Sequence, residues 1–136
     1  LCDHDIREYF RNTQPSIIGL SAVVSTSYLT VKQIASIARE ECPHSWIVMG
    51  GYLAASAHVV LKKTEVDICI KGDGEIPLLE FINYVKKHGR KKIYTELSNI
   101  KGLIYQDDTN NIHINMPGDS IPSNEIPFPD YDLLAS

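Results

Sequence analysis

The sequence contains little that is typical of a secreted, membrane-spanning or nucleic-acid-binding protein. Its three cysteines, Cys2, Cys42 and Cys69, include no close pair that could begin a zinc or iron–sulfur site, so we expect reduced thiols in a cytoplasmic protein. No apolar run approaches the roughly 18 residues of a membrane-spanning helix, and Leu1 begins no signal pattern. The net charge of −4 argues against a general affinity for nucleic acid or anionic lipid.

Several motifs of catalytic sites are also missing. The chain has no GxGxxG, no GxxxxGK[ST], no HExxH and no paired carboxylates at a strand end that would suit phosphoryl-aspartate chemistry. Its histidines lie beside no candidate nucleophile in a recognisable spacing, so no acid–base triad can be argued; they are His4, His44, His58, His88 and His113. His58 follows Gly50-Gly51 on a predicted helix, where we interpret it as a surface residue and not as a ligand.

What is present has the composition of one globular domain. The 136 residues are 43% hydrophobic and 22% charged, and a chain of this size needs no disulfide or metal to hold a core. Between residues 15 and 87, short apolar runs alternate with segments of helical period, which predicts strands at 16–21, 47–49 and 66–70, each followed by a helix. The pattern predicts an α/β fold of the flavodoxin-like, Rossmann-like type, with a mostly parallel sheet and helices on both faces.

The flanking segments add three further elements. Ile6, Tyr9 and Phe10 predict a short opening helix. Residues 102–105 and 112–115 flank a polar turn at 107–111 and predict a β-hairpin appended to the sheet. The last twenty residues are rich in proline and predict an extended strap or linker.

In an open parallel sheet, ligands bind at the carboxyl ends of the strands, so the three loops that follow the predicted strands are the candidate site. Gly50-Gly51 would let a ligand approach the backbone, or would simply form a tight turn. Ser21 and Ser25 could bond a polar ring or phosphate, or cap the next helix. Residues 72–75, Gly-Asp-Gly-Glu, could surround a ribose or phosphate with backbone amides, although their carboxylates would repel a bare phosphate. The residues alone indicate a binding domain for a ligand with nucleotide-like parts.

Taken together and in order, the runs 15–21, 25–26, 47–51 and 66–75 resemble the cobalamin-binding domain that precedes the core of radical S-adenosylmethionine enzymes. The exit through 100–105 and 127–134 resembles the bridge from that domain into the core barrel. The resemblance implies that the nucleotide tail of cobalamin lies in a slot between strands and helices. Residue by residue, it assigns cofactor binding to Ser21, Ser25, Thr26, Gly50, Gly51, Tyr52, Gly72 and Gly74.

The chain departs from that family in two respects. The Asp-x-His-x-x-Gly motif, whose histidine ligates cobalt in methionine synthase and mutase domains, is absent, and Asp3-His4-Asp5 does not replace it. Because the opening helix resembles the second helix of the family, we expect the first strand to lie upstream of Leu1 in a longer protein. No CxxxCxxC follows, so the resemblance places the 4Fe-4S cluster and S-adenosylmethionine in the parent protein only, and no residue here is assigned a catalytic role.

The expected organisation is a partial cobalamin-binding domain at residues 1–92, a hairpin extension at 93–118 and a linker at 119–136. The resemblance implies a domain that positions the corrinoid for a radical core, in a methyltransferase or cyclase-like enzyme. The alternative is a degenerate domain that binds no cofactor and serves for docking, with Val23, Val24 and Tyr52 filling the slot. A flavin or nucleotide binder on the same architecture is a more distant alternative. Without its first strand, the sheet should expose an unpaired edge and the chain should self-associate.

Overall fold

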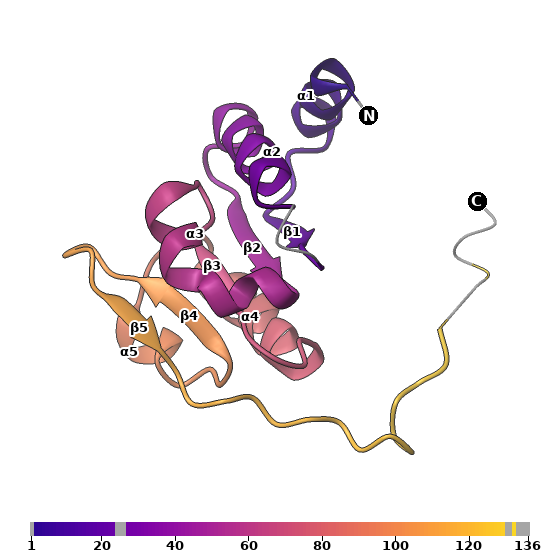
Figure 1. Cartoon of the computed structure of the whole chain (residues 1–136), viewed down its shortest axis with the longest axis vertical. Helices are drawn as coiled ribbons and strands as arrows, with labels where there is room; N and C mark the ends of the chain where they lie inside the picture. The colour runs from indigo at the N-terminus through magenta and orange to yellow at the C-terminus, as the bar shows by residue number, and fades with distance from the viewer. Residues whose placement is uncertain (1, 24–26, 130–131, 133–136) are drawn as a thin grey trace.

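The computed structural model describes residues 2–23, 27–129 and 132, except for the side chains of Tyr52 and Leu53. Its centre is one five-stranded sheet in the order β1-β2-β3-β4-β5 (Figure 1). β1, β2 and β3 are parallel, and β4 and β5 continue the sheet as an antiparallel hairpin. The strands are β1 Ile17–Ser21, β2 Trp46–Gly50, β3 Ile68–Ile70, β4 Leu103–Gln106 and β5 Ile112–Ile114. The predicted parallel sheet and appended hairpin are confirmed.

Helices cover both faces of the sheet, as predicted. One face carries α1 (Asp3–Thr13), α2 (Tyr28–Glu41) and α3 (Ala57–Lys63), and the other carries α4 (Glu75–His88) and α5 (Tyr94–Leu97). A 3-10 helix, η2 (Tyr52–Ser56), leads into α3. The sequence pattern did not predict η2 or α5 as separate helices, because each is too short to show a helical period.

The third strand, Ile68–Ile70, is shorter than the expected 66–70. Asp67, directly before it, still donates its backbone N–H to Ile47 O at 2.8 Å, and its side chain binds neighbouring segments. Its carboxylate accepts a hydrogen bond from the backbone N–H of Ile47 at 2.8 Å and forms ion pairs with Arg39 at 2.7 Å and Arg90 at 2.9 Å. These contacts join three segments below the amino end of the sheet.

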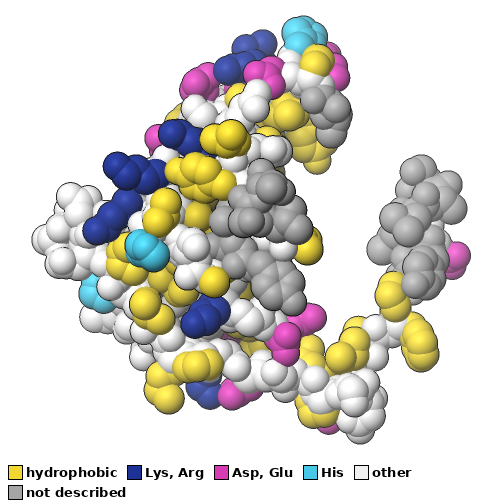
Figure 2. Space-filling model, in the orientation of Figure 1, with side chains coloured by type: hydrophobic (Ala, Val, Ile, Leu, Met, Phe, Trp, Pro, Cys, Tyr) yellow, Lys and Arg dark blue, Asp and Glu magenta, His cyan; other side chains and the backbone are white. Residues whose placement is uncertain are grey.

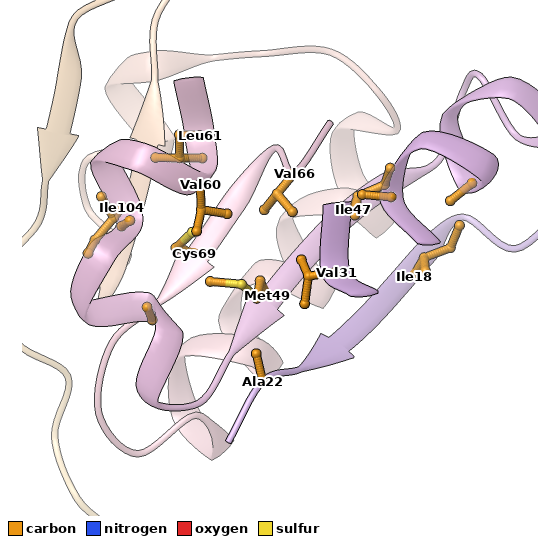
Figure 3. Packing of buried hydrophobic residues seen from close by; sticks show 14 of the residues in the cluster. Ile18, Ala22, Val31, Ile47, Met49, Val60, Leu61, Val66, Cys69 and Ile104 are labelled. Carbon is orange, nitrogen blue, oxygen red and sulfur yellow. The ribbon is translucent and has the colours of Figure 1, made fainter. Parts of the chain in front are cut away.

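The two faces of the sheet bury different cores because successive strand residues point to opposite sides. Figure 3 shows the aliphatic core, in which Met49 and Cys69 from the sheet lie near Val60 and Val31 from the helices. Burial raises the pKa of the Cys69 thiol to about 12, so this cysteine is a neutral core residue. On the other face, Trp46 meets Phe81 edge to face, with ring centroids 5.2 Å apart.

The first strand lies at one edge of the sheet. Trp46 N donates to Ser16 O at 2.9 Å and Ala22 N donates to Gly50 O at 3.0 Å. Since bonding residues alternate along a parallel strand, the backbone groups of the odd-numbered residues between them point away from β2. No strand pairs with β1 on that side within the described part of the chain. A groove of about 570 Å³ runs along this edge between β1 and α1.

Beyond β5 the chain leaves the sheet as the predicted extended strap. The strap first passes α4, where a Cβ added to Gly118 would lie 3.0 Å from Pro77 Cγ, and Lys101 pairs with Asp119 at 2.8 Å. It then runs away from the body and exposes Ile126 and Phe128 (Figures 1 and 2). None of the described helices is long and apolar enough to cross a membrane.

Candidate functional site

A cavity of about 430 Å³ lies at the carboxyl ends of β1, β2 and β3, on the face of the sheet that α4 covers. We call this cavity the slot. Its residues come from the three loops singled out above, from the strands below them and from the first turn of α4. The described residues that line it are Gly19, Leu20, Ser21, Val48, Gly50, Gly51, Ile70, Gly72, Gly74, Glu75 and Leu78.

The floor of the slot is nearly free of side chains. Gly19 pairs with Val48 and Ser21 pairs with Gly50 in the β1–β2 register, so Gly19, Ser21 and Gly50 present the same face of the sheet. A Cβ added to Gly19 or to Gly50 would meet nothing within 4 Å. A flat ligand can therefore lie directly on the backbone of these two strands.

Gly51 has a different role from its neighbour. Its φ is +93°, and a Cβ at this position would lie 2.5 Å from the carbonyl oxygen of Ala22. Only glycine fits this left-handed conformation beside another backbone. The two interpretations of the diglycine thus apply to different residues: Gly51 forms the tight turn, and Gly50 leaves the floor open.

Apolar side chains form the walls, with few polar groups at the rim. Val48 and Ile70 are buried, while Leu78 in the first turn of α4 is 37% exposed. Ser21 supplies a hydroxyl on the sheet side and Glu75 a carboxylate on the α4 side. Such a space, apolar with a few polar groups, suits a planar ring joined to a polar sugar.

The structure brings together five of the eight predicted site residues in this one cavity: Ser21, Gly50, Gly51, Gly72 and Gly74. Ser25 and Thr26 lie outside the described residues. Tyr52 begins η2, and its side chain is not described. Of the residues expected to fill the slot in the cofactor-free alternative, Val23 is 61% exposed and does not fill it; Val24 is also outside the described residues.

Of the remaining slot residues, Glu75 belongs to the 72–75 loop considered from the sequence, and the others were assigned no role in binding. Gly19 gave a usable signal, because a glycine inside an apolar strand indicates a close approach to the backbone. Leu20, Val48, Ile70 and Leu78 gave none, since apolar strand and helix positions look the same whether they face a core or a ligand. Within the described residues, no group of three or more His, Cys, Asp or Glu side chains is placed to hold a metal ion.

Comparison with known families decides which ligand class this geometry serves. A family model described as the B12 binding domain matches residues 2–82. The chain belongs to the B12-binding domain family. The matched part runs from α1 into α4 and contains every lining residue of the slot.

Solved structures of similar fold agree with this assignment. The chain matches the cobalamin-dependent S-adenosylmethionine radical enzyme OxsB with aqua-cobalamin and S-adenosylmethionine bound, with a TM-score of 0.78 and 22% identity. OxsB with aqua-cobalamin alone, and the apo, selenomethionine-labelled OxsB, each match with a TM-score of 0.75 and 23% identity. Each match covers 98% of this chain and 18% of the OxsB chain, so this chain spans about a fifth of that protein. No curated protein matches the chain.

These findings confirm the resemblance, the flavodoxin-like fold and cobalamin as the cofactor of this B12-binding domain. The residues present also fit the cofactor. The open space above Gly19 and Gly50 is a cradle that side chains would fill, and the buried walls offer apolar contact to a ring. Nothing found supports the cofactor-free alternative.

Proposed function

We propose that this B12-binding domain holds the corrinoid of a larger, cobalamin-dependent radical S-adenosylmethionine enzyme, and that the slot takes the nucleotide tail of the cofactor. The open glycine floor at the carboxyl ends of β1 and β2 is the observation that carries the proposal. In an ordinary core the same positions would be occupied by side chains, because protein interiors are close-packed.

The residues of the slot bind and orient the tail. Val48, Ile70 and Leu78 provide apolar contact for a benzimidazole-like ring. Ser21 offers a neutral hydroxyl as a hydrogen-bond partner. When bound, cobalamin supplies a cobalt centre for methyl transfer or for another radical step, while the protein supplies positioning.

The catalytic core of such an enzyme would lie outside this chain, together with its S-adenosylmethionine and 4Fe-4S cluster. We propose that residues 1–92 form the cobalamin-binding unit with 93–118 as its hairpin extension, and that 119–136 lead toward that core. Exposed Ile126 and Phe128 on the strap would contact it. The proposed partners are therefore the corrinoid, the radical core and, for the chain alone, a second copy along the free edge of β1. The location we expect is cytoplasmic.

Filling the slot floor tests the proposal. Gly50→Ala, Gly50→Val and Gly50→Leu place increasing volume into space that holds no protein atom within 4 Å. Overpacking costs about 1–3 kcal/mol, so we expect the dissociation constant for aquacobalamin to rise by about 5- to 100-fold along the series. The measurement is corrin absorbance retained after gel filtration, with titration for affinity.

Cobinamide, which lacks the nucleotide, is the matched ligand control. Its binding should be weaker than that of cobalamin in the unchanged protein and insensitive to the Gly50 series. The proposal fails if the unchanged protein retains no corrinoid, or if all three variants bind cobalamin as the unchanged protein does while remaining folded. Flavin absorbance in the purified protein would instead favour the flavin-binding alternative.

A further inference from the structure

Glu75 differs chemically from the other residues that line the slot. It carries the only charge among the lining residues that the structure describes. It is the first residue of α4, and Gly74 is the N-cap. Within the described part of the chain, its carboxylate takes part in no hydrogen bond or ion pair. An unpaired carboxylate at the edge of an otherwise apolar and glycine-lined cavity has acceptor capacity available to a ligand.

The opposite side of the slot is chemically different. The end of β1 carries the Ser21 hydroxyl, and Gly50 at the end of β2 and Gly51 directly after it line the slot without a side chain or a charge. β2 lies between β1 and β3, so two strand spacings, about 10 Å, separate Ser21 from the strand end that leads to Glu75. A ligand lying across the floor thus meets a neutral, hydroxyl-bearing side and an anionic side.

A nucleotide tail has two kinds of polar group that distinguish these sides. Its phosphodiester is an anion, which a carboxylate repels, less strongly at an exposed position such as that of Glu75 than in an interior. Its ribose hydroxyls are hydrogen-bond donors, which a carboxylate accepts with charge assistance. The ribose is therefore favoured at Glu75, and the phosphodiester at Ser21 and the diglycine.

We propose that Glu75 determines specificity for the nucleotide tail: its carboxylate accepts a hydrogen bond from a ribose hydroxyl and keeps the phosphodiester at the β1 side of the slot. This rests on the proposed function, because it takes the slot to be the place of the tail. It adds to the proposed function the residue that recognises the tail, the hydrogen bond that it accepts and the orientation of the tail in the slot.

The test compares Glu75→Ala with the unchanged protein in titrations with three ligands: cobalamin, cobinamide, and cobalamin whose ribose hydroxyls are O-methylated. We expect Glu75→Ala to weaken cobalamin binding by about tenfold and to leave cobinamide binding unchanged. With the methylated ligand, the unchanged protein and the variant should bind alike, because the donor is already lost. Glu80→Ala, an exposed change on the same helix outside the slot, should alter none of the three affinities.

An acidic residue in the first turn also interacts favourably with the helix dipole, and the design separates that role from specificity. A dipole effect lowers the thermal stability of the ligand-free variant and weakens cobalamin and cobinamide alike. An equal loss with both ligands, no loss with cobalamin, or tighter cobalamin binding by Glu75→Ala would each overturn the role of Glu75. If the unchanged protein shows no preference for cobalamin over cobinamide, the proposed function itself fails, and the specificity role fails with it.

Discussion

The two adjacent glycines at the end of β2, Gly50 in the strand and Gly51 directly after it, differ in what a side chain would meet. Gly51→Ala would force a Cβ to 2.5 Å from the Ala22 carbonyl oxygen at a φ of +93°. We expect it to lower the free energy of unfolding by about 1–3 kcal/mol. A Cβ added by Gly50→Ala would meet no neighbour within 4 Å. The free energy of unfolding should therefore stay the same or rise by about 0.5–1 kcal/mol, because alanine has less backbone entropy to lose on folding than glycine. Urea unfolding measures both, and equal destabilisation would contradict this division of roles.

Some residues of the candidate site could be predicted from the sequence, and others could not. Ser21, Gly50, Gly51, Gly72 and Gly74 could be placed at the candidate site because ligands bind at the carboxyl ends of parallel strands, where these residues stand. The different uses of Gly50 and Gly51 could not be predicted, because they depend on the position of Ala22 in a loop about thirty residues away. The apolar walls gave no signal, since only the tertiary arrangement decides which apolar side chains remain beside an open space.

Among the elements, the β4–β5 hairpin is stabilised by an acidic side chain in its turn. Asp107 accepts hydrogen bonds from Thr109 Oγ1 at 2.7 Å and from the backbone of Asn111 at 3.0 Å, and it pairs with His113 Nε2 at 2.6 Å. The bond to His113, followed by that to Thr109, holds the pKa of Asp107 well below its usual range. The ring of His113 in turn stacks on Tyr105, with centroids 5.2 Å apart.

This arrangement predicts an acid-sensitive hairpin. A carboxyl group whose pKa is lowered by folding stabilises the fold above its unfolded pKa of about 3.9. That stabilisation is lost as the pH falls through the lower folded value. We therefore expect the hydrogen-exchange protection of the His113 and Asn115 amides, which face β4, to fall below about pH 4 before the rest of the sheet opens. Asp107→Asn should give fast exchange at pH 6 already, whereas Asp108→Asn should keep the unchanged profile. Uniform protection of β5 down to global acid unfolding would contradict the expectation.

Most helices and strands could be predicted from the sequence, and two of them begin elsewhere than expected. The three strand–helix units and the hairpin follow from hydrophobic period and turn residues. β3 begins at Ile68, two residues later than expected, although Asp67 N still donates to Ile47 O. The ion pairs of Asp67 with Arg39 and Arg90 join segments distant in sequence, and nothing in the sequence pattern predicted them. α1 begins at Asp3, with the Cys2 backbone N–H donating to Asp5, ahead of the apolar residues Ile6, Tyr9 and Phe10 that predicted the helix.

For the whole molecule, the free edge of β1 is the feature with the largest expected effect on solution behaviour. The odd-numbered residues of this strand direct backbone N–H and C=O groups away from β2. The adjacent groove is lined largely by apolar residues of α1 and β1, including Ile6, Tyr9 and Phe10. Unpaired strand edges beside apolar surface invite pairing with another chain, so we expect the isolated chain to associate through β1.

A charge on that edge should prevent the association. Gly19 is exposed, and a Cβ there would meet nothing within 4 Å, so Gly19→Lys adds a charge beside the edge, on the slot face of β1, with little strain; association is therefore measured without corrinoid. Light scattering over a concentration series should show association of the unchanged protein and a dissociation constant raised by at least about tenfold in Gly19→Lys. Asn83→Lys, which adds the same charge on exposed α4, should associate as the unchanged protein does, because the edge is intact. A monomer at every concentration, or equal weakening by both substitutions, would mean that the edge of β1 does not pair with a second copy.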